Sequence, residues 1–339
     1  MKSIIVGDWQ WILYEEALAK GFKYRQIEVI PFKTSKYFNS FLKKIQKKLR
    51  CGILITKLNN DLLSLCEEKK PNFIFFQRPE LILPNTLSRI KCLMPKVVLI
   101  SYHNDNPYIQ NFKGFKYSHY FNCLPYFDIN YVYRPSNVNQ AKKIGAKNVK
   151  VLLPYYIKGV HNKAITEEKK YDVVFIGHYE NDNRVDFCNY LLDQGINLKI
   201  FGTGWPNKIE KKIGENIVPL RGDLYVKTLQ EAKIALVFYS TLNEDVYTRR
   251  NFEIPATGTF MLTPQSEELD KIFIPNKHCV YYSHKEDLLK KINFYLQHEN
   301  ERETIAKTGC ELCRKKFSNF SISQKILNDI EEYENSRSY

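Results

Sequence analysis

The stretch from residue 247 to 264 carries the residue types best suited to chemistry, because cations, a carboxylate, a glycine and an apolar run follow one another there. Arg250 and Glu253 are three residues apart, so on a helix they share one face. Gly258 stands where that helix would end, since glycine adopts left-handed dihedral angles at little cost. A cation beside a carboxylate at the end of a sheet suits a phosphate and a ribose hydroxyl, so the stretch predicts a nucleotide site.

Two other apolar runs end in glycine. Gly177 follows the run 171–176, where a glycine lets a ligand approach the backbone and the helix beginning near Arg184 can direct its N-terminus at a phosphate. The alternative is an ordinary turn between strand and helix, with Arg184 in solvent. In the stretch 201–205, Trp205 follows two glycines, and its ring either covers a sugar or base or packs onto the turn.

In the first half of the chain, polar residues follow the apolar run 97–100. His103 and Asp105 would therefore lie at the carboxyl end of a strand. A histidine in such a place can act as a general base or bind a phosphate. A lone histidine in a loop is more often only a hydrogen-bonded loop residue, so both interpretations stay open.

The first predicted strand, near residues 2–7, is followed by Asp8, Trp9 and Trp11. Aromatic rings stack on the faces of sugars, so either tryptophan could hold an acceptor sugar beside Asp8. Packing of each ring into the domain core is the alternative.

Residues 38–50 show an amphipathic basic pattern in which apolar residues alternate with five cations. The cations are Lys43, Lys44, Lys47, Lys48 and Arg50. Such a helix either lies on an anionic membrane beside a lipid-linked acceptor or docks on the first sheet as an ordinary surface helix.

The composition excludes several classes of protein. The 339 residues are too many for one ordinary domain, and the 44% hydrophobic and 14% aromatic content argues against disorder. No apolar run reaches the ~20 residues that span a bilayer, and the N-terminal pattern is that of a strand, not of a signal peptide. Eight cysteines without regular spacing indicate reduced thiols in a cytoplasmic protein. The net charge of +14 favours anionic partners, but no zinc-finger or RNP-like pattern predicts specific binding of nucleic acid.

Short apolar strands alternate with amphipathic helices along the chain, which indicates parallel sheets covered on both faces. We expect strands near residues 2–7, 25–30, 72–77, 96–101, 129–133, 149–153, 171–176, 197–201, 233–238, 259–263 and 279–282. A helix is expected over 246–257. The polar stretch 154–170 follows neither pattern and is predicted to link two doubly wound sheets. Ligands bind beyond the carboxyl ends of the strands in such sheets, which is where the residues above would lie.

The sequence Phe-Glu-Ile-Pro-Ala at 252–256 resembles the signature of the CgeB-like, spore-maturation type glycosyltransferases, which are related to the group 1 glycosyltransferases. The resemblance spans roughly residues 95–330 and is strongest at 171–177, 200–205, 220–223 and 248–262. It implies an α/β protein of the GT-B fold, with two facing Rossmann-like domains and the reaction in the cleft between them.

The GT-B fold implies an acceptor-side domain over residues 1–157 and a nucleotide-sugar-binding domain over 158–319. A last helix near 320–334 is expected to cross back onto the first domain.

The resemblance also implies roles in a donor site. Gly177 and Arg184 would line the site, and the loop with Arg221 and Gly222 would pass the nucleobase. Glu253 would bind the ribose hydroxyls, and Arg250, with Arg249 and Arg184, would neutralise the diphosphate. The alternative for Glu253 is a salt bridge to Arg250. Asp245, eight residues before Glu253, stands where large retaining GT-B families usually have an acid that touches the sugar.

The resemblance thus implies a metal-independent glycosyltransferase without a cofactor. It would move a sugar from a nucleotide-diphosphate sugar or another activated sugar to a glycan, lipid-linked or protein acceptor, in bacterial surface polysaccharide or glycoconjugate synthesis. Retention of configuration is expected from Glu253 and its neighbours, whereas inversion would need a base such as His103, Asp105 or Asp8. We expect a cytoplasmic protein with possible peripheral contact at the inner face of an anionic membrane. A catalytically idle binding or assembly protein of the same fold, and less so a basic nucleic-acid-binding protein, are the alternatives.

Overall fold

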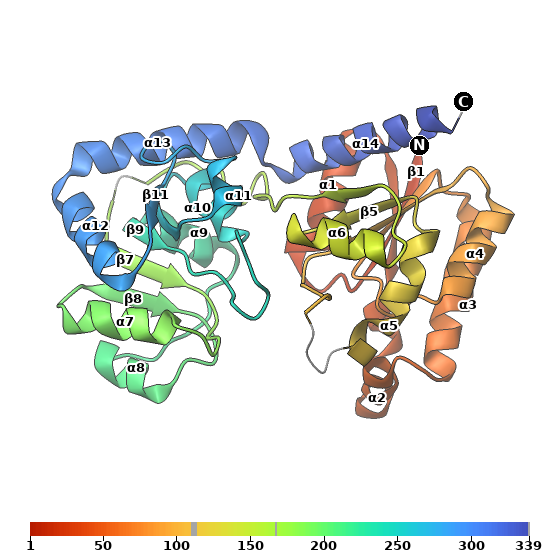
Figure 1. The fold of residues 1–339 in the computed structure, drawn as a ribbon, viewed down its shortest axis with the longest axis horizontal. Coiled ribbons are helices and arrows are strands. Elements are labelled where there is room, and N and C mark those ends of the chain that lie inside the picture. The colour runs from red at the N-terminus through yellow and green to blue at the C-terminus, as the bar shows by residue number, and fades with distance from the viewer. Residues whose placement is uncertain (110–113, 167, 338–339) are drawn as a thin grey trace. The chain divides into compact units, whose positions relative to one another are not determined.

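The computed structural model describes residues 1–109, 114–166 and 168–337. For residues 41–42 and 114–115 it describes the backbone but not the side chains. The chain divides into two compact units. Unit 1 comprises Met1–Leu153 and Asn319–Tyr339, and unit 2 comprises Pro154–Ser318. Each unit contains one parallel sheet with helices packed against it (Figure 1). No helix in the described part of the chain is both long and apolar enough to cross a membrane.

Unit 1 is built on a six-stranded parallel sheet with the order β2-β1-β3-β4-β5-β6. Its strands are β1 (Lys2–Gly7), β2 (Glu28–Lys33), β3 (Phe73–Gln77), β4 (Val98–His103), β5 (Ile129–Val132) and β6 (Val149–Val151). The sequence of β3 is apolar at four successive positions because both faces of this inner strand are covered. Phe73 packs on Phe22 with ring centroids 5.3 Å apart, whereas Ile74 points to the opposite face and joins a separate apolar cluster with Leu62 and Ile90.

The helices of unit 1 connect these strands on both faces. They are η1 (Ile12–Glu16), α1 (Ala17–Tyr24), η2 (Thr34–Tyr37), α2 (Phe41–Leu49), α3 (Ile53–Lys69), α4 (Pro84–Leu93), α5 (Gly114–Cys123), η3 (Leu124–Tyr126), α6 (Ser136–Lys143) and α14 (Asn319–Ser336). The last helix, α14, lies against α1, and the Asn319 amide donates to the carbonyl of Ala17 at 2.7 Å. Gly21 permits this close packing, because a Cβ at that position would overlap Ser323.

Unit 2 is built on a five-stranded parallel sheet with the order β11-β10-β9-β7-β8. Its strands are β7 (Tyr171–Ile176), β8 (Leu198–Phe201), β9 (Ala232–Leu236), β10 (Phe260–Pro264) and β11 (Val280–Tyr282). Its helices are α7 (Arg184–Asp193), α8 (Asn207–Ile213), α9 (Gly222–Gln230), α10 (Arg250–Ala256), α11 (Glu267–Asp270), α12 (Lys285–Gln297) and α13 (Glu299–Lys316). The core lies between the sheet and the helices, with Phe175 and Leu236 packed among residues of α7 and α12.

The structure shortens the helix expected over 246–257 to the seven residues of α10. Side chains explain the late start, because the Thr248 hydroxyl accepts from the backbone N–H of Arg250 at 3.1 Å and Asn251 Oδ1 accepts from the N–H of Thr248 at 2.7 Å. Both bonds hold the preceding backbone outside the helix. The beginning of the stretch expected to be a linker is also ordered, since Tyr156 is buried and its N–H donates to the carbonyl of Phe317 at 2.9 Å.

Candidate functional site

The sheet of unit 2 has a topological switch point between β7 and β9. The chain enters at β7, places β8 on one side of it and then returns to place β9 on the other side. The loops that leave the carboxyl ends of these two strands therefore run in opposite directions, and open parallel sheets bind their ligands at such a point. Gly177 begins one of these loops, and the other covers residues 237–249.

Two glycines let the loops after β7 and β8 touch. The N–H of Gly177 donates to the carbonyl of Phe201 at 2.8 Å. A Cβ on Gly202 would overlap the carbonyl oxygen of Gly177, so no side chain fits there. Trp205 is buried, packs edge-on against Phe175, and donates its indole N–H to the Gly177 carbonyl at 2.9 Å. Of the two interpretations of Trp205, the structure supports packing onto the turn.

Arg250 lies at the carboxyl end of β7. It is the first residue of α10, it is half-buried, and its Nε donates to the carbonyl of Ile176 at 2.5 Å. A Cβ added to Gly177 would lie 3.1 Å from Nη2 of Arg250 and 2.6 Å from the ring of Phe175. The absence of a side chain at Gly177 is thus what allows the guanidinium to rest against the loop after β7.

Glu253 is paired with Arg249 and not with Arg250. The carboxylate is only 5% exposed; its Oε1 accepts from Arg249 Nε at 2.9 Å and its Oε2 accepts from the Tyr225 hydroxyl at 3.0 Å. Burial raises the pKa of Glu253, but Arg249, His161 and the two hydrogen bonds more than offset this and lower it below the ordinary value. The alternative of a salt bridge between Arg250 and Glu253 is wrong, because Arg250 instead turns toward β7.

Three aromatic residues that the sequence did not single out complete this cluster. The Arg249 guanidinium lies over the ring of Tyr155 at 4.8 Å, and Tyr225 comes from α9. His161 is buried, its Nδ1 accepts from the N–H of Ile157 at 2.9 Å, and its Nε2 lies 3.9 Å from Glu253 Oε1. Burial lowers the pKa of His161; the charge of Glu253 opposes this in part and Arg249 adds to it. No sequence signal marks Tyr155 or His161, because both lie in the unpatterned stretch after residue 153.

Arg184 supports the loop after β7 from inside the protein. It is only 3% exposed, and its Nε and Nη2 each donate to a carboxylate oxygen of Asp182 at 2.7 Å. Its Nη1 donates to the carbonyl of His178 at 2.7 Å. The solvated arginine of the alternative interpretation is therefore wrong, and the donors of the guanidinium are directed at the loop itself. Glu180 extends the network by accepting from Ser240 at 2.5 Å, which joins the loops after β7 and β9.

The remaining residues predicted for the donor site lie at the edges of this region. Arg221 and Gly222 are exposed at the start of α9, the helix that carries Tyr225. Gly222 has a φ of +55°, in the left-handed region that favours glycine. Asp245 is half-buried in the loop after β9, where its N–H donates to the carbonyl of Ser240 at 2.9 Å.

In unit 1, His103 is the last residue of β4 and not a loop residue. It is 2% exposed, with Nε2 3.3 Å from Glu80 Oε1 and Nδ1 3.3 Å from the carbonyl of Asp105. Glu80, which the sequence analysis missed, also pairs with Arg50 at 2.5 Å. Burial acts to raise the pKa of Glu80, but His103, Lys116 and Arg50 lower it to about 2. Glu80 follows an apolar strand just as His103 does, so the same strand-end rule could have found it.

Asp8 and the two tryptophans follow β1 at the same edge of this sheet. The N–H of Asp8 donates to the buried Glu15 at 2.8 Å, and its carboxylate lies 3.6 Å from Lys47. Trp9 has a left-handed φ of +56° and donates its indole N–H to the carbonyl of Ile5 at 3.2 Å, whereas Trp11 is exposed. The half-buried side chain of Asp105, in the loop after β4, accepts from the Asn104 amide at 3.3 Å.

No three His, Cys, Asp or Glu side chains are grouped so that they could hold a metal ion within residues 1–109, 114–166 and 168–337.

Comparison with known proteins gives a family-model match over part of the chain and a fold for the whole. Residues 184–328 match the family model described as glycosyl transferase-like. A crystal structure of HepE from Anabaena in complex with UDP and glucose is similar to the chain with a TM-score of 0.69 at 12% identity, covering 98% of this chain and 100% of that one. Sucrose-phosphate synthase from Thermosynechococcus elongatus gives a TM-score of 0.73 at 10% identity, with 98% of each chain covered. A glycosyltransferase from Rickettsia africae gives 0.67 at 10% identity, again with 98% of each chain covered. No curated protein matches the sequence. The architecture of two Rossmann-like parallel sheets is that of the GT-B fold.

Proposed function

Since residues 184–328 form a glycosyl transferase-like domain in a chain of the GT-B fold, we propose that the protein transfers a sugar from a nucleotide-sugar donor to an acceptor. We assign the donor to unit 2, at the carboxyl ends of β7 and β9. The observation that carries this assignment is the position of Arg250, whose guanidinium rests beside Gly177 at the switch point of the sheet. A diphosphate bound there would meet a fixed cation and a backbone without a side chain.

Arg250 is the group we propose for the leaving diphosphate. Negative charge on the nucleoside diphosphate grows as the bond to the sugar breaks, and a cation already in place stabilises that charge without reorganisation. Its hydrogen bond to the carbonyl of Ile176 holds the guanidinium in this position before the donor arrives. Arg249, the preceding residue, is engaged in the ion pair with Glu253, so Arg250 is the cation of this pair that we assign to the diphosphate.

Glu253 is the group we propose for the ribose. Its carboxylate is covered by the Tyr225 hydroxyl and Arg249, so a ribose hydroxyl would take the place of the Tyr225 hydroxyl at Oε2. The exchange replaces one hydroxyl donor by another and leaves the buried charge satisfied throughout. We assign the base to Gly222 and Arg221, which lie at the start of the helix that bears Tyr225.

The solved structure of HepE contains UDP and glucose, which makes a UDP-sugar the first donor to test here.

We further propose that the reaction needs no metal and retains the configuration of the transferred sugar. Support for retention comes from His103, one of the three candidate bases for an inverting reaction, because it is buried with both ring nitrogens near polar partners. The eight cysteines are all free, which supports a cytoplasmic site of action. A surface glycan or glycoconjugate remains the proposed acceptor.

A thermal-shift panel tests the donor site. UDP, GDP, TDP, CMP and ADP are added to the protein, each beside its nucleoside, because a ligand that binds only the folded state raises its apparent stability. One diphosphate should raise the unfolding temperature while its nucleoside has little effect. Arg250→Ala should remove most of this shift, whereas the exposed Arg89→Ala in α4 of unit 1 should retain it.

Protection by no diphosphate, or equal protection of the parent and Arg250→Ala, would contradict the proposed site. Release of UDP from UDP-sugars then separates an enzyme from an idle binding protein, and nuclear magnetic resonance of the product's anomeric carbon reads out retention. Tight binding of RNA with no effect of any diphosphate would favour the nucleic-acid alternative.

A further inference from the structure

The helix α2 in unit 1 directs apolar side chains into solvent. Ile45 and Leu49 are four residues apart, so they share one face of the helix, and they are 42% and 49% exposed. Ile53, at the start of α3, is 82% exposed. An ordinary amphipathic surface helix buries its apolar face against the core, so this arrangement is the reverse of the expected one.

Polar contacts hold α2 against the rest of unit 1. Gln46 Oε1 accepts from the N–H of Leu54 at 3.0 Å, and Lys47 lies 3.6 Å from the Asp8 carboxylate. Arg50, the residue after the last turn, pairs with Glu80 at 2.5 Å. The expectation that the helix docks on the sheet through its apolar face is therefore wrong for Ile45 and Leu49.

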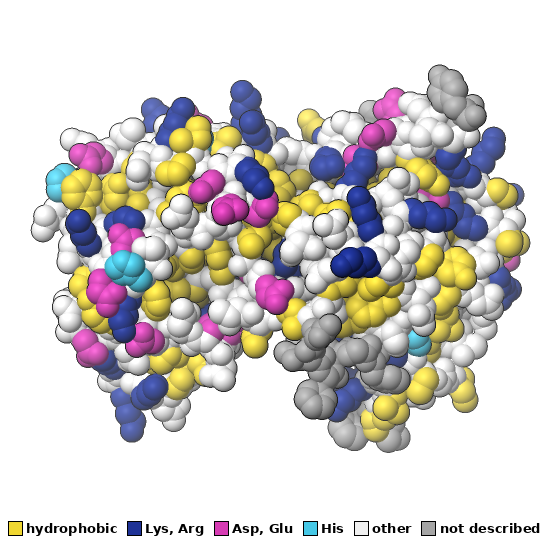
Figure 2. Space-filling view, in the orientation of Figure 1, with side chains coloured by type: hydrophobic (Ala, Val, Ile, Leu, Met, Phe, Trp, Pro, Cys, Tyr) yellow, Lys and Arg dark blue, Asp and Glu magenta, His cyan; other side chains and the backbone are white. Residues whose placement is uncertain are grey.

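Exposed cations lie on the same two helices as the exposed apolar side chains. Lys43, Lys44 and Lys48 are all exposed on α2, and Lys57 is exposed one turn into α3. Figure 2 shows hydrophobic side chains, with Lys or Arg beside them, over the part of unit 1 where Figure 1 labels α2. Apolar side chains flanked by lysines complement a surface that is anionic at its boundary and apolar beneath it.

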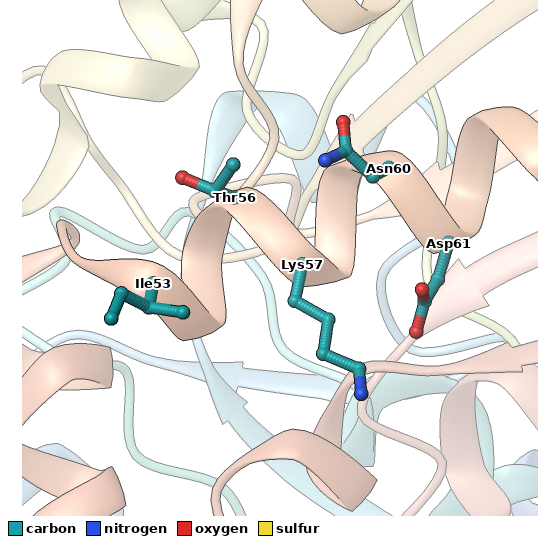
Figure 3. Close-up of a pocket in the computed structure, with 5 residues that line it drawn as sticks. All are labelled: Ile53, Thr56, Lys57, Asn60 and Asp61. Atoms are coloured by element: carbon teal, nitrogen blue, oxygen red, sulfur yellow. The ribbon is translucent and has the colours of Figure 1, made fainter.

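A shallow hollow adjoins Ile53. It has a volume of about 400 Å³ and is lined along α3 by Ile53, Thr56, Lys57, Asn60 and Asp61. Figure 3 shows the Lys57 and Asp61 side chains pointing to the same side of the helix. Asp61 already accepts from the Tyr37 hydroxyl at 2.7 Å. Lys57 thus places a cation at an open hollow beside the most exposed apolar side chain of the group.

We propose that Ile45, Leu49 and Ile53, together with Lys43, Lys44 and Lys48, dock unit 1 on an anionic lipid bilayer. We call these six residues the α2 surface. The proposal deepens the proposed function and rests on it, because it assigns the acceptor to the class of membrane-anchored molecules.

Two contacts, made by residues of α2 outside the α2 surface and just after this helix, connect it to the edge of the sheet where acceptor residues are expected. Lys47 reaches Asp8 after β1, and Arg50 reaches Glu80, whose other carboxylate oxygen lies 3.3 Å from His103 at the end of β4. Docking of the α2 surface would therefore bring the carboxyl edge of this sheet to the bilayer. A lipid-linked or membrane-embedded acceptor would meet that edge without leaving the membrane.

Vesicle co-sedimentation of the full chain tests the proposal. The probes are vesicles of phosphatidylcholine alone and vesicles with about one third phosphatidylglycerol. A lysine near an anionic surface contributes about fivefold to the partition coefficient, so Lys43→Gln, Lys44→Gln and Lys48→Gln together should weaken binding to the anionic vesicles at least tenfold. Leu49→Gln with Ile53→Gln should weaken it by about tenfold or more, and this loss should persist at high salt.

Matched controls come from exposed residues of the same unit. Lys142→Gln, Lys143→Gln and Lys147→Gln remove the same charge from another surface, and Leu93→Gln with Ile144→Gln removes apolar side chains of comparable exposure. Both controls should bind vesicles like the parent. Urea unfolding and the diphosphate thermal shift, measured on every variant, should be unchanged.

Each outcome decides a separate point. The proposal is overturned if the parent does not bind vesicles, or if both sets of α2 variants bind them as well as the parent does. The proposed function would still stand in that case if the diphosphate shift persists. Vesicle binding without any diphosphate shift overturns the assignment of the acceptor. A dimer that Leu49→Gln with Ile53→Gln converts to a monomer, with no vesicle binding, would assign the α2 surface to a second copy of the chain and overturn the proposal.

Discussion

Replacement of Glu253 should weaken folding and donor binding together. The carboxylate is 5% exposed and forms its ion pair with Arg249 at 2.9 Å. Removal of one partner from a buried ion pair costs about 3–5 kcal/mol, because the other charge is left uncompensated. Arg249 retains some exposure and lies over Tyr155, so we expect Glu253→Ala to cost about 3 kcal/mol, at the lower end. A unit of this size would then unfold roughly 6–12 °C lower.

Glu253→Gln separates charge from shape. The amide oxygen can still accept from Tyr225, so the loss should be smaller, about 1–2 kcal/mol at neutral pH. Because the pKa of Glu253 is lower in the folded than in the unfolded protein, its charge stabilises the folded state above the unfolded pKa of about 4.3. That contribution is lost as the pH falls through the folded pKa, so the difference between the parent and Glu253→Gln should shrink in acid.

Tyr225→Phe is the matched variant for the ribose. It removes the hydroxyl that covers Oε2 but keeps the carboxylate, at a cost of about 1 kcal/mol in stability. Calorimetric titration with the best diphosphate should show equal or tighter binding for Tyr225→Phe and at least tenfold weaker binding for Glu253→Gln. Equal losses in the two variants would mean that Tyr225 contacts the ribose and Glu253 only positions it. Unchanged stability and affinity in Glu253→Gln would refute the reasoning.

Three further outcomes follow from the same site. Gly177→Ala should lower the free energy of unfolding by about 1–3 kcal/mol and weaken diphosphate binding about tenfold, because its Cβ meets Phe175 and Arg250. The control Gly195→Ala lies in open space and should leave binding unchanged, even though its left-handed φ strains the turn. Equal binding by both variants would speak against contact of the diphosphate with the loop after β7. Arg184→Ala should lower the free energy of unfolding by about 3–5 kcal/mol through the buried Asp182 that it leaves unpaired, and a loss below 1 kcal/mol in urea titration would count against the buried network. Sugar transfer or UDP release should proceed equally in EDTA and in magnesium, and a loss restored by manganese would show that a metal is needed.

The sequence predicted those features that depend on local pattern. Runs such as the one over 171–176 could be assigned to buried parallel strands because nearly every residue in them is apolar. Gly177 could be placed at a strand end for the same reason. The sequence could not show why a glycine is needed there, because the close approach of Arg250 appears only in the folded chain.

What could not be predicted depends on contacts between distant parts of the chain. His161 meets Glu253 only because the stretch after residue 153 packs into unit 2, and nothing in the spacing of either residue records this. The choice of Arg249 over Arg250 as the partner of Glu253 was also open, since positions three and four residues away on a helix are both neighbours. The carbonyl of Ile176 decides it by accepting the Nε–H of Arg250. The exposure of Ile45 and Leu49 could not be predicted, because periodicity shows that a helix has two faces and not which one is buried.

The most direct test of the donor site is a crystal structure of the protein with the nucleoside diphosphate that gives the largest thermal shift. Our assignment predicts that the diphosphate lies at the carboxyl ends of β7 and β9, within hydrogen-bonding distance of the Arg250 guanidinium and against the backbone of Gly177. It also predicts that the ribose replaces the Tyr225 hydroxyl at Glu253. A nucleotide bound in unit 1, or at another edge of unit 2 with Arg250 unchanged, would contradict it.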